Sequence, residues 1–137
     1  MRRVPLLLVL AALGGCGGSS AKPKTTSAAP AAKRLSVVIL GESHRPVVGR
    51  KWHYEVRVTA GGKPVSCRIH LQFLFSGAPV GEVGRHVLAD GVWRETFGVG
   101  ANPPFPPAAR GQSLLLEATA TKPGYRSGHA GWPVVPR

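Results

Sequence analysis

Residues 52–58 read WHYEVRV, and residues 65–75 read VSCRIHLQFLF. Apolar and polar side chains alternate along the first stretch, which is typical of a half-buried strand. In the second stretch, apolar side chains occupy every second position from Val65 to Phe75. A helix would scatter these side chains around its circumference, whereas a strand points them all to one face. The two stretches therefore predict an all-β fold.

Turn signals and shorter alternating runs extend this prediction to the rest of the chain. Gly61-Gly62 separates the two long runs, and both residues can adopt the positive φ values of a tight turn. Asp90-Gly91 predicts a second turn, which joins two neighbouring strands. About seven strands in roughly 100 residues is the size of an immunoglobulin-like β-sandwich. The predicted strands cover residues 35–40, 52–58, 65–75, 85–88, 92–97, 114–121 and 132–135.

The order of these turns resembles the bacterial Ig-like domains of surface and adhesin proteins. The matching positions are Gly62-Lys63-Pro64-Val65 between two strands, Asp90-Gly91-Val92-Trp93 as a hairpin, and Ala109-Arg110-Gly111 before the penultimate strand. The resemblance implies a β-sandwich that binds or spaces at a cell surface. Adhesins usually string many such domains together, whereas this chain contains one. Turn motifs of this kind say little about activity.

The first residues of the chain have the pattern of an export signal. Arg2 and Arg3 precede an apolar run over residues 4–13. That run is too short for a membrane-spanning helix, which needs about 20 apolar residues. Positive charge, a short apolar run and small residues are typical of a secretory signal, here of the ordinary Sec kind.

Leu13, Gly14, Gly15 and Cys16 resemble the lipobox of bacterial lipoproteins, in which an aliphatic and two small residues precede a cysteine. The resemblance implies cleavage before Cys16 and transfer of a diacylglyceryl group to its thiol. Two acyl chains at one residue suffice for stable membrane anchoring. The alternative is an ordinary signal that is cut further on, near residue 21 or 28.

Residues 17–34 read GGSSAKPKTTSAAPAAKR and contain no large apolar side chain that could be buried. Such a composition predicts a flexible linker. The predicted organisation is a signal peptide over residues 1–15, the lipidated Cys16 with the linker over 16–34, and the Ig-like β-sandwich over 35–137. The chain would then be held by its lipid on the outer face of the bacterial cell membrane.

The chain is strongly basic, with 18 Lys and Arg against 6 Asp and Glu and a formal net charge of +12. This excess predicts either attraction to anionic lipid headgroups or acidic wall polymers, or no more than solubility. Nucleic acid is not an expected partner, because an exported protein rarely meets it. Residues 52–58 also place aromatic and basic side chains on opposite strand faces, which does not suit a nucleic-acid platform.

The sequence predicts no catalytic residue, no cofactor and no enzymatic activity. The carboxylates Glu55 and Glu117 take outward strand positions, and the one aspartate, Asp90, belongs to a turn. Cys67 and His70 are three residues apart and therefore face opposite sides of a strand. With Cys16 acylated, Cys67 has no disulfide partner, and its position predicts burial as a small hydrophobe. The acidic residues are Glu42, Glu55, Glu82, Asp90, Glu95 and Glu117.

Histidines and a proline-rich stretch supply two further hypotheses. The histidines at 44, 53, 70, 86 and 129 lack the spacing of a metal motif, so isolated solvent-facing side chains are favoured. The alternative is a metal site in which His129 joins Glu42 and His44. Residues 98–111 read GVGANPPFPPAARG and predict a polyproline II segment. Phe105 in this segment either presents a docking loop or folds back onto the core, and the second interpretation is favoured.

Together these features predict a lipid-anchored, extracytoplasmic Ig-like module that binds or spaces and has no catalytic activity. Its partners would be the membrane, through the lipid anchor, and an envelope protein or an anionic wall polymer. Two alternatives remain: a metal- or small-ligand-binding lipoprotein, and an accessory subunit of an envelope enzyme. A concave site would favour the small-ligand alternative, and a flat surface with an exposed Phe105 would favour partner docking.

Overall fold

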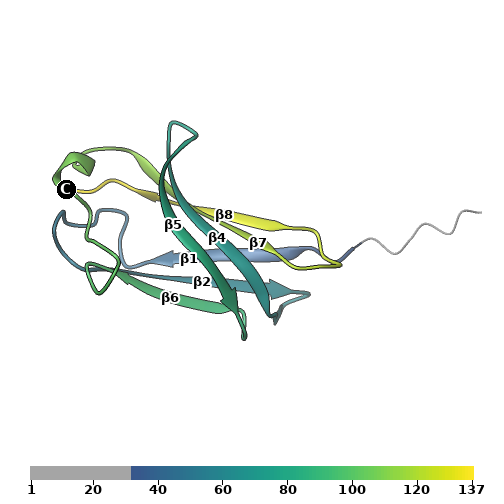
Figure 1. Cartoon of the computed structure of the whole chain (residues 1–137). Coiled ribbons are helices and arrows are strands. Elements are labelled where there is room, and N and C mark those ends of the chain that lie inside the picture. Colours follow the sequence, from purple (N-terminus) through teal and green to yellow (C-terminus); the bar gives the residue numbers. More distant parts are fainter. Residues whose placement is uncertain (1–31) are drawn as a thin grey trace, which may run out of the picture.

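Two antiparallel sheets face each other in the computed structural model, which describes residues 32–137 (Figure 1). In the first sheet, β2 (Trp52–Ala60) pairs with β1 (Leu35–Gly41) on one side and with β3 (Lys63–Pro64) and β6 (Val92–Phe97) on the other. The second sheet has the order β5 (Ala78–Leu88), β4 (Cys67–Phe75), β7 (Leu114–Thr121), β8 (Gly128–Val134). A short 3-10 helix, η1, covers Pro107–Ala109. The predicted all-β, Ig-like sandwich is confirmed.

The predicted signal peptide, Cys16 and most of the linker fall in residues 1–31, outside the described residues. Within residues 32–137, no helix is long and apolar enough to cross a bilayer.

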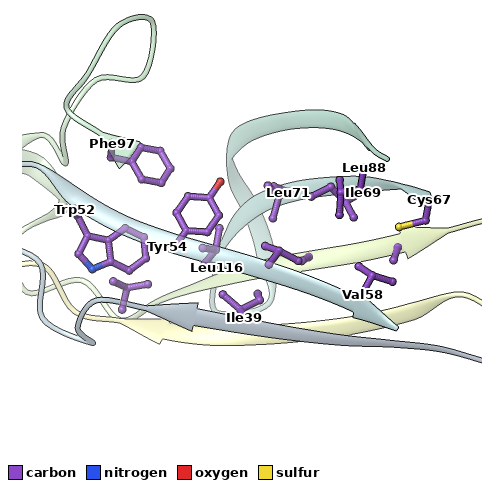
Figure 2. Close-up of a cluster of buried hydrophobic side chains, with 14 of the residues drawn as sticks. Ile39, Trp52, Tyr54, Val58, Cys67, Ile69, Leu71, Leu88, Phe97 and Leu116 are labelled. Atoms are coloured by element: carbon purple, nitrogen blue, oxygen red, sulfur yellow. The ribbon is translucent and has the colours of Figure 1, made fainter. Parts of the chain in front are cut away.

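Alternation of side chains builds the core, as the sequence predicts. The inward positions of β2, β4 and β7 are buried between the sheets (Figure 2). Close to the β4–β5 hairpin the burial ends: Phe73 is half-buried and Phe75 is 41% exposed. Figure 1 shows why, since this hairpin extends past the strands of the first sheet. The buried side chains of the three strands are Trp52, Tyr54, Val56, Val58, Cys67, Ile69, Leu71, Leu116, Ala118 and Ala120.

The two predicted glycine turns have the expected backbone but partly different roles. Gly61 and Gly62 have φ values of 59° and 78°, and they turn β2 into the short β3. The chain then crosses to the second sheet, so the two long strands β2 and β4 are not hairpin partners.

The predicted hairpin at Asp90-Gly91 is wrong, because β5 lies in the second sheet and β6 in the first. Gly91 docks on the end of β2, where the Val58 N–H donates to the Gly91 carbonyl oxygen at 2.8 Å. A Cβ atom at Gly91 would lie 2.6 Å from the Val58 carbonyl oxygen, so this approach requires glycine. The docked turn directs β6 to the free edge of β2 instead of back along β5.

Two strands are longer than predicted. β5 begins at Ala78, not near residue 85, because register shifts opposite Leu71/Gln72 and Phe73/Leu74 interrupt its alternation. β8 begins at Gly128, not at residue 132, and its first residues carry small or polar side chains that gave no apolar signal.

Backbone contacts between β1 and β8 close one side of the sandwich. The Leu35 N–H donates to the Arg126 carbonyl oxygen at 2.9 Å, and the Arg126 N–H donates to the Lys33 carbonyl oxygen at 2.9 Å. Arg34 and Arg126 form a parallel bridge. Lys33 and Arg34, which the sequence analysis assigned to the linker, thus lie along this edge. Gly128 is adjacent, and a Cβ atom there would overlap the Leu35 carbonyl group.

Replacing Gly128 with alanine is expected to lower the free energy of unfolding by about 3 kcal/mol, because backbone atoms must move to admit the methyl group. Gly81→Ala is the matched control, since its Cβ would meet nothing closer than 3.9 Å. Urea unfolding of both variants provides the measurement. Equal stability of the two variants would contradict the close β1–β8 contact.

Candidate functional site at the loop end of the sandwich

Three segments meet at the end of the sandwich opposite residue 32, which we call the loop end (Figure 1). They are residues 42–51, residues 98–113 and the C-terminal residues. The Gly49 N–H donates to the Phe105 carbonyl oxygen at 3.0 Å, and the Gly111 N–H donates to the Pro136 carbonyl oxygen at 2.7 Å. The Val48 N–H donates to the Arg137 carbonyl oxygen at 2.9 Å. Backbone hydrogen bonds therefore hold the three segments together.

Phe105 folds back onto the core, as favoured from the sequence. It is 6% exposed, and its ring centroid lies 5.7 Å from those of Trp52 and Phe97 and 5.5 Å from that of Phe73. The docking hypothesis that requires an exposed Phe105 is wrong. Pro106, with φ −74° and ψ 158°, has the predicted polyproline II backbone, and η1 follows it directly.

An apolar groove lies beside this segment, between the proline residues and the β4–β5 hairpin. Its volume is about 520 Å³. Phe75 and Val80 form its exposed rim, with 41% and 57% of their surfaces accessible. Among the described residues, no charged side chain lines it. The groove is lined by Phe73, Phe75, Val80, Gly81, Phe97, Pro103, Pro104, Phe105, Pro106, Ala108, Ala109, Gln112 and Leu114.

The carboxylate of Glu95 fixes the base of residues 98–106. It accepts hydrogen bonds from the Tyr54 hydroxyl, from the Trp93 indole Nε1 at 3.2 Å and from the Asn102 side-chain amide. The Gly98 N–H donates to the Asn102 carbonyl oxygen at 2.7 Å and completes a tight turn. No role is predicted for Glu95 from the sequence. Its two-residue spacing from Trp93 and Phe97, which also point inward, is the signal that could have revealed it.

Burial and the Glu95 contact affect the acidity of Tyr54. Burial raises the pKa of the Tyr54 phenol well above its usual range, and the hydrogen bond with Glu95 raises it further. The neutral phenol is thus the form that the core accepts.

Glu55 and Glu117, the carboxylates at outward strand positions, both accept hydrogen bonds from neighbouring side chains. Glu55 lies between Arg57 and Arg94, and the hydrogen bond from Arg57 holds the pKa of the Glu55 carboxyl below its usual range. The Gln72 amide donates to Glu117 at 3.0 Å. These contacts satisfy both carboxylates as acceptors.

Cys67 is buried, as predicted, and desolvation raises the pKa of its thiol. His70 lies on the opposite face of β4, with its ring Nε2 2.8 Å from a Glu82 carboxylate oxygen. The prediction that strand parity separates Cys67 from His70 is confirmed.

The histidines are less isolated than predicted. His44 is exposed, but its ring stacks on Trp132 with centroids 4.0 Å apart. His86 stacks on Trp93 at 3.7 Å, and its buried Nε2 has no hydrogen-bond partner among the described residues. The solvent-facing prediction is wrong for His86, because β5 places it directly opposite the buried Ile69. Within residues 32–137, no three or more His, Cys, Asp or Glu side chains gather as metal ligands.

Comparison with solved structures supports the fold. The chain is similar to the superoxide reductase (neelaredoxin) of Ignicoccus hospitalis, with a TM-score of 0.53 and 15% identity over 78% of this chain and 82% of that one. A conjugative transposon lipoprotein of Bacteroides eggerthii gives a TM-score of 0.48 and 11% identity over 73% and 95% of the two chains. A CARDB domain of Pyrococcus furiosus, solved with di-metal ions, gives 0.46 and 18% over 77% and 96%.

At these identities the similarity shows a β-sandwich fold and no more. The chain matches no model of a known protein family, and no curated protein sequence matches it.

We expect the folded state to lose stability above about pH 10. The unfolded Tyr54 ionises near that pH, whereas the folded one, with its raised pKa, stays neutral. The Tyr54 contribution to stability is therefore retained below pH 10 and falls as pH rises further, by up to about 1.4 kcal/mol per pH unit. Urea unfolding between pH 8 and 11 measures the slope. Cys67 adds a further loss, because burial raises the pKa of its thiol, and this loss begins at lower pH because a free thiol ionises at lower pH than a free phenol.

Tyr54→Phe should flatten the alkaline slope, even though it also lowers overall stability by leaving Glu95 one donor short. Tyr125→Phe is the matched control and should keep the wild-type slope. An unchanged slope in Tyr54→Phe would show that Tyr54 is not protected from ionisation.

Proposed function

We propose that this chain is a lipid-anchored, extracytoplasmic binding module without catalytic activity, which presents the groove at its loop end. The observation that carries the proposal is the placement of the groove. Residue 32, through which the predicted lipidated segment joins the domain, lies at the opposite end of the sandwich (Figure 1). A tether at that end leaves the groove directed away from the membrane, where a partner or ligand can reach it.

The composition of the groove supports binding of an apolar group. Its walls are aromatic rings, prolines and aliphatic side chains, and Gln112 is its one polar side chain within the described residues. Contiguous exposed apolar surface of this kind is typical of ligand- or partner-binding grooves. Phe75 and Val80 are the rim residues that a bound group would cover first.

The concave shape of the groove favours the small-ligand alternative over a flat protein contact. A volume of about 520 Å³ falls in the range of small-molecule sites, which are concave and mostly apolar. The second candidate function is therefore a lipoprotein that binds a small apolar ligand at the same groove.

We propose the absence of catalysis because the side chains that could react are buried, ion-paired or hydrogen-bonded within the fold. Cys67 is buried with a raised pKa, and Glu55 is neutralised by two arginines. Asp90 accepts from the Val92 N–H in its own turn, at 3.3 Å. A nucleophile or general base needs an accessible partner at hydrogen-bond distance, and these groups are engaged elsewhere.

Cross-linking in intact cells, followed by detergent partitioning, tests the anchor and the groove together. The wild type should enter the detergent phase, and Cys16→Ser should leave it. Val80→Lys should stay in the detergent phase but capture several-fold less cross-linked material, because a charge at the rim opposes burial of an apolar group.

Val38→Lys is the matched control, since Val38 is 47% exposed on β1, away from the groove, and this variant should behave as wild type. An unmodified Cys16 thiol in the mass spectrum of the native protein would disprove the anchor. Equal capture by Val80→Lys and Val38→Lys would disprove the role of the groove.

A further inference from the structure

Acidic side chains are unevenly placed along the sandwich. Glu55, Glu82 and Glu117 lie within the strands and contact arginine, histidine or glutamine there. The end at which residue 32 lies, which we call the N-terminal end, carries Asp90 as its acidic residue. Its basic residues are Lys33, Arg34, Lys63, Arg68, Lys122 and Arg126.

Backbone pairing places these basic residues at one end. Arg34 bridges to Arg126, and Lys63 pairs with Ala60, which itself pairs with Leu35. Arg68, at the start of β4, is opposite Thr121, at the end of β7. The positive charge at this end therefore follows from the topology.

A hollow of about 630 Å³ opens at this end, next to the β7–β8 turn. Arg68 and Lys122 line it together with hydroxyl groups, and neither cation forms an ion pair within residues 32–137. The Lys122 ammonium donates to the Ser66 carbonyl oxygen at 2.7 Å and to its hydroxyl at 3.0 Å, which positions the charge. The hydroxyl groups belong to Ser66, Thr121 and Ser127.

Val87 gives this hollow an apolar rim. It is 73% exposed, more than any other large apolar side chain of the described residues, and it is opposite Arg68 in the β4–β5 pair. Cations and hydroxyls recognise phosphate oxygens. An exposed aliphatic side chain beside them suits the boundary between lipid headgroups and acyl chains.

We propose that this hollow binds the phosphodiester headgroup of an anionic lipid, so that the N-terminal end of the sandwich docks on the bilayer. The inference rests in part on the proposed function, because the lipid anchor would bring this end to the membrane. Arg68 and Lys122 contact the phosphate, and Val87 enters the interface. The loop end then faces outward.

Flotation with vesicles tests the docking separately from the anchor. The protein is the predicted mature chain, residues 16–137, carrying Cys16→Ser, so that neither an acyl group nor the apolar run of residues 4–13 can bind the vesicles. The vesicles are phosphatidylcholine alone, or an equimolar mixture with phosphatidylglycerol. We expect binding to the mixed vesicles, weakened by added salt, and little binding to phosphatidylcholine.

Charge variants locate the contact. Arg68→Gln with Lys122→Gln should weaken binding to the mixed vesicles on the order of tenfold or more. The matched control, Arg50→Gln with Arg110→Gln, removes the same charge from the loop end and should leave binding within about twofold, since those residues lie beyond a Debye length from the surface. Val87→Ser disturbs no side-chain hydrogen bond and should also weaken binding, which separates docking from misfolding.

Three results would overturn the proposal. Equal losses from the two charge pairs would mean that net charge alone governs binding. Equal affinity for both vesicle types would exclude headgroup recognition. If the Arg68 and Lys122 variant lost its binding to isolated wall polymer but kept its binding to vesicles, the hollow would be assigned to another polyanion. Because every chain in this experiment lacks the acyl group, none of these results depends on whether Cys16 is lipidated in the cell.

Discussion

The indole ring of Trp52 is buried between the two sheets, beside the rings of Tyr54 and Phe97 (Figure 2). The ring of Phe105 packs against it edge-on, with the ring centroids 5.7 Å apart. The Trp52 Nε1 donates to the Ser43 carbonyl oxygen at 3.0 Å, which ties the loop of residues 42–51 to the same side chain. Buried aromatic rings of this size contribute much of a small core's stability. The walls of the groove are thus set by core packing, because Phe97 and Phe105 belong both to the aromatic cluster and to the groove lining.

The sequence predicts the features of this fold that depend on neighbouring residues along the chain. Alternation identifies the inward faces of β2, β4 and β7, and it places Cys67 in the core and His70 outside. Phe105 is also predicted correctly, because a lone aromatic side chain among prolines gains most by covering the edge of a core. These features need no knowledge of which strand pairs with which.

Features that depend on which strands pair with each other are not predicted by the sequence pattern. Gly91 has the positive φ of a turn, 75°, but the partner of the following strand is decided by the contact of Gly91 with β2. His86 points inward and is half-buried because β5 places it opposite Ile69, and the register shifts of β5 hide this from the pattern. The groove itself combines residues from β4, β5, β6 and the proline segment, so no local stretch of sequence reveals it.

The two ends of the sandwich differ in chemistry, and each end carries one of the two proposed binding surfaces. One end joins the predicted lipidated segment and holds, around a hydroxyl-lined hollow, two cations that form no ion pair within residues 32–137. The other end holds an apolar groove on a rigid aromatic base. The carboxylates of Glu55, Glu82 and Glu117 lie between the two ends and contact side chains on the strands, so they do not neutralise the positive charge of the basic end.

The orientation of the domain on a membrane tests this account most directly. The acylated protein would be reconstituted in vesicles with a fluorophore on Ser36→Cys, an exposed β1 position at the N-terminal end and outside the hollow, or on Val99→Cys, at the loop end; Cys67 is buried and stays unlabelled. The account predicts that a quencher attached to the lipid headgroups quenches the label at residue 36 strongly. The label at residue 99, about 30 Å further out along strands of this length, should be quenched little. Equal quenching at both positions, or stronger quenching at residue 99, would contradict it.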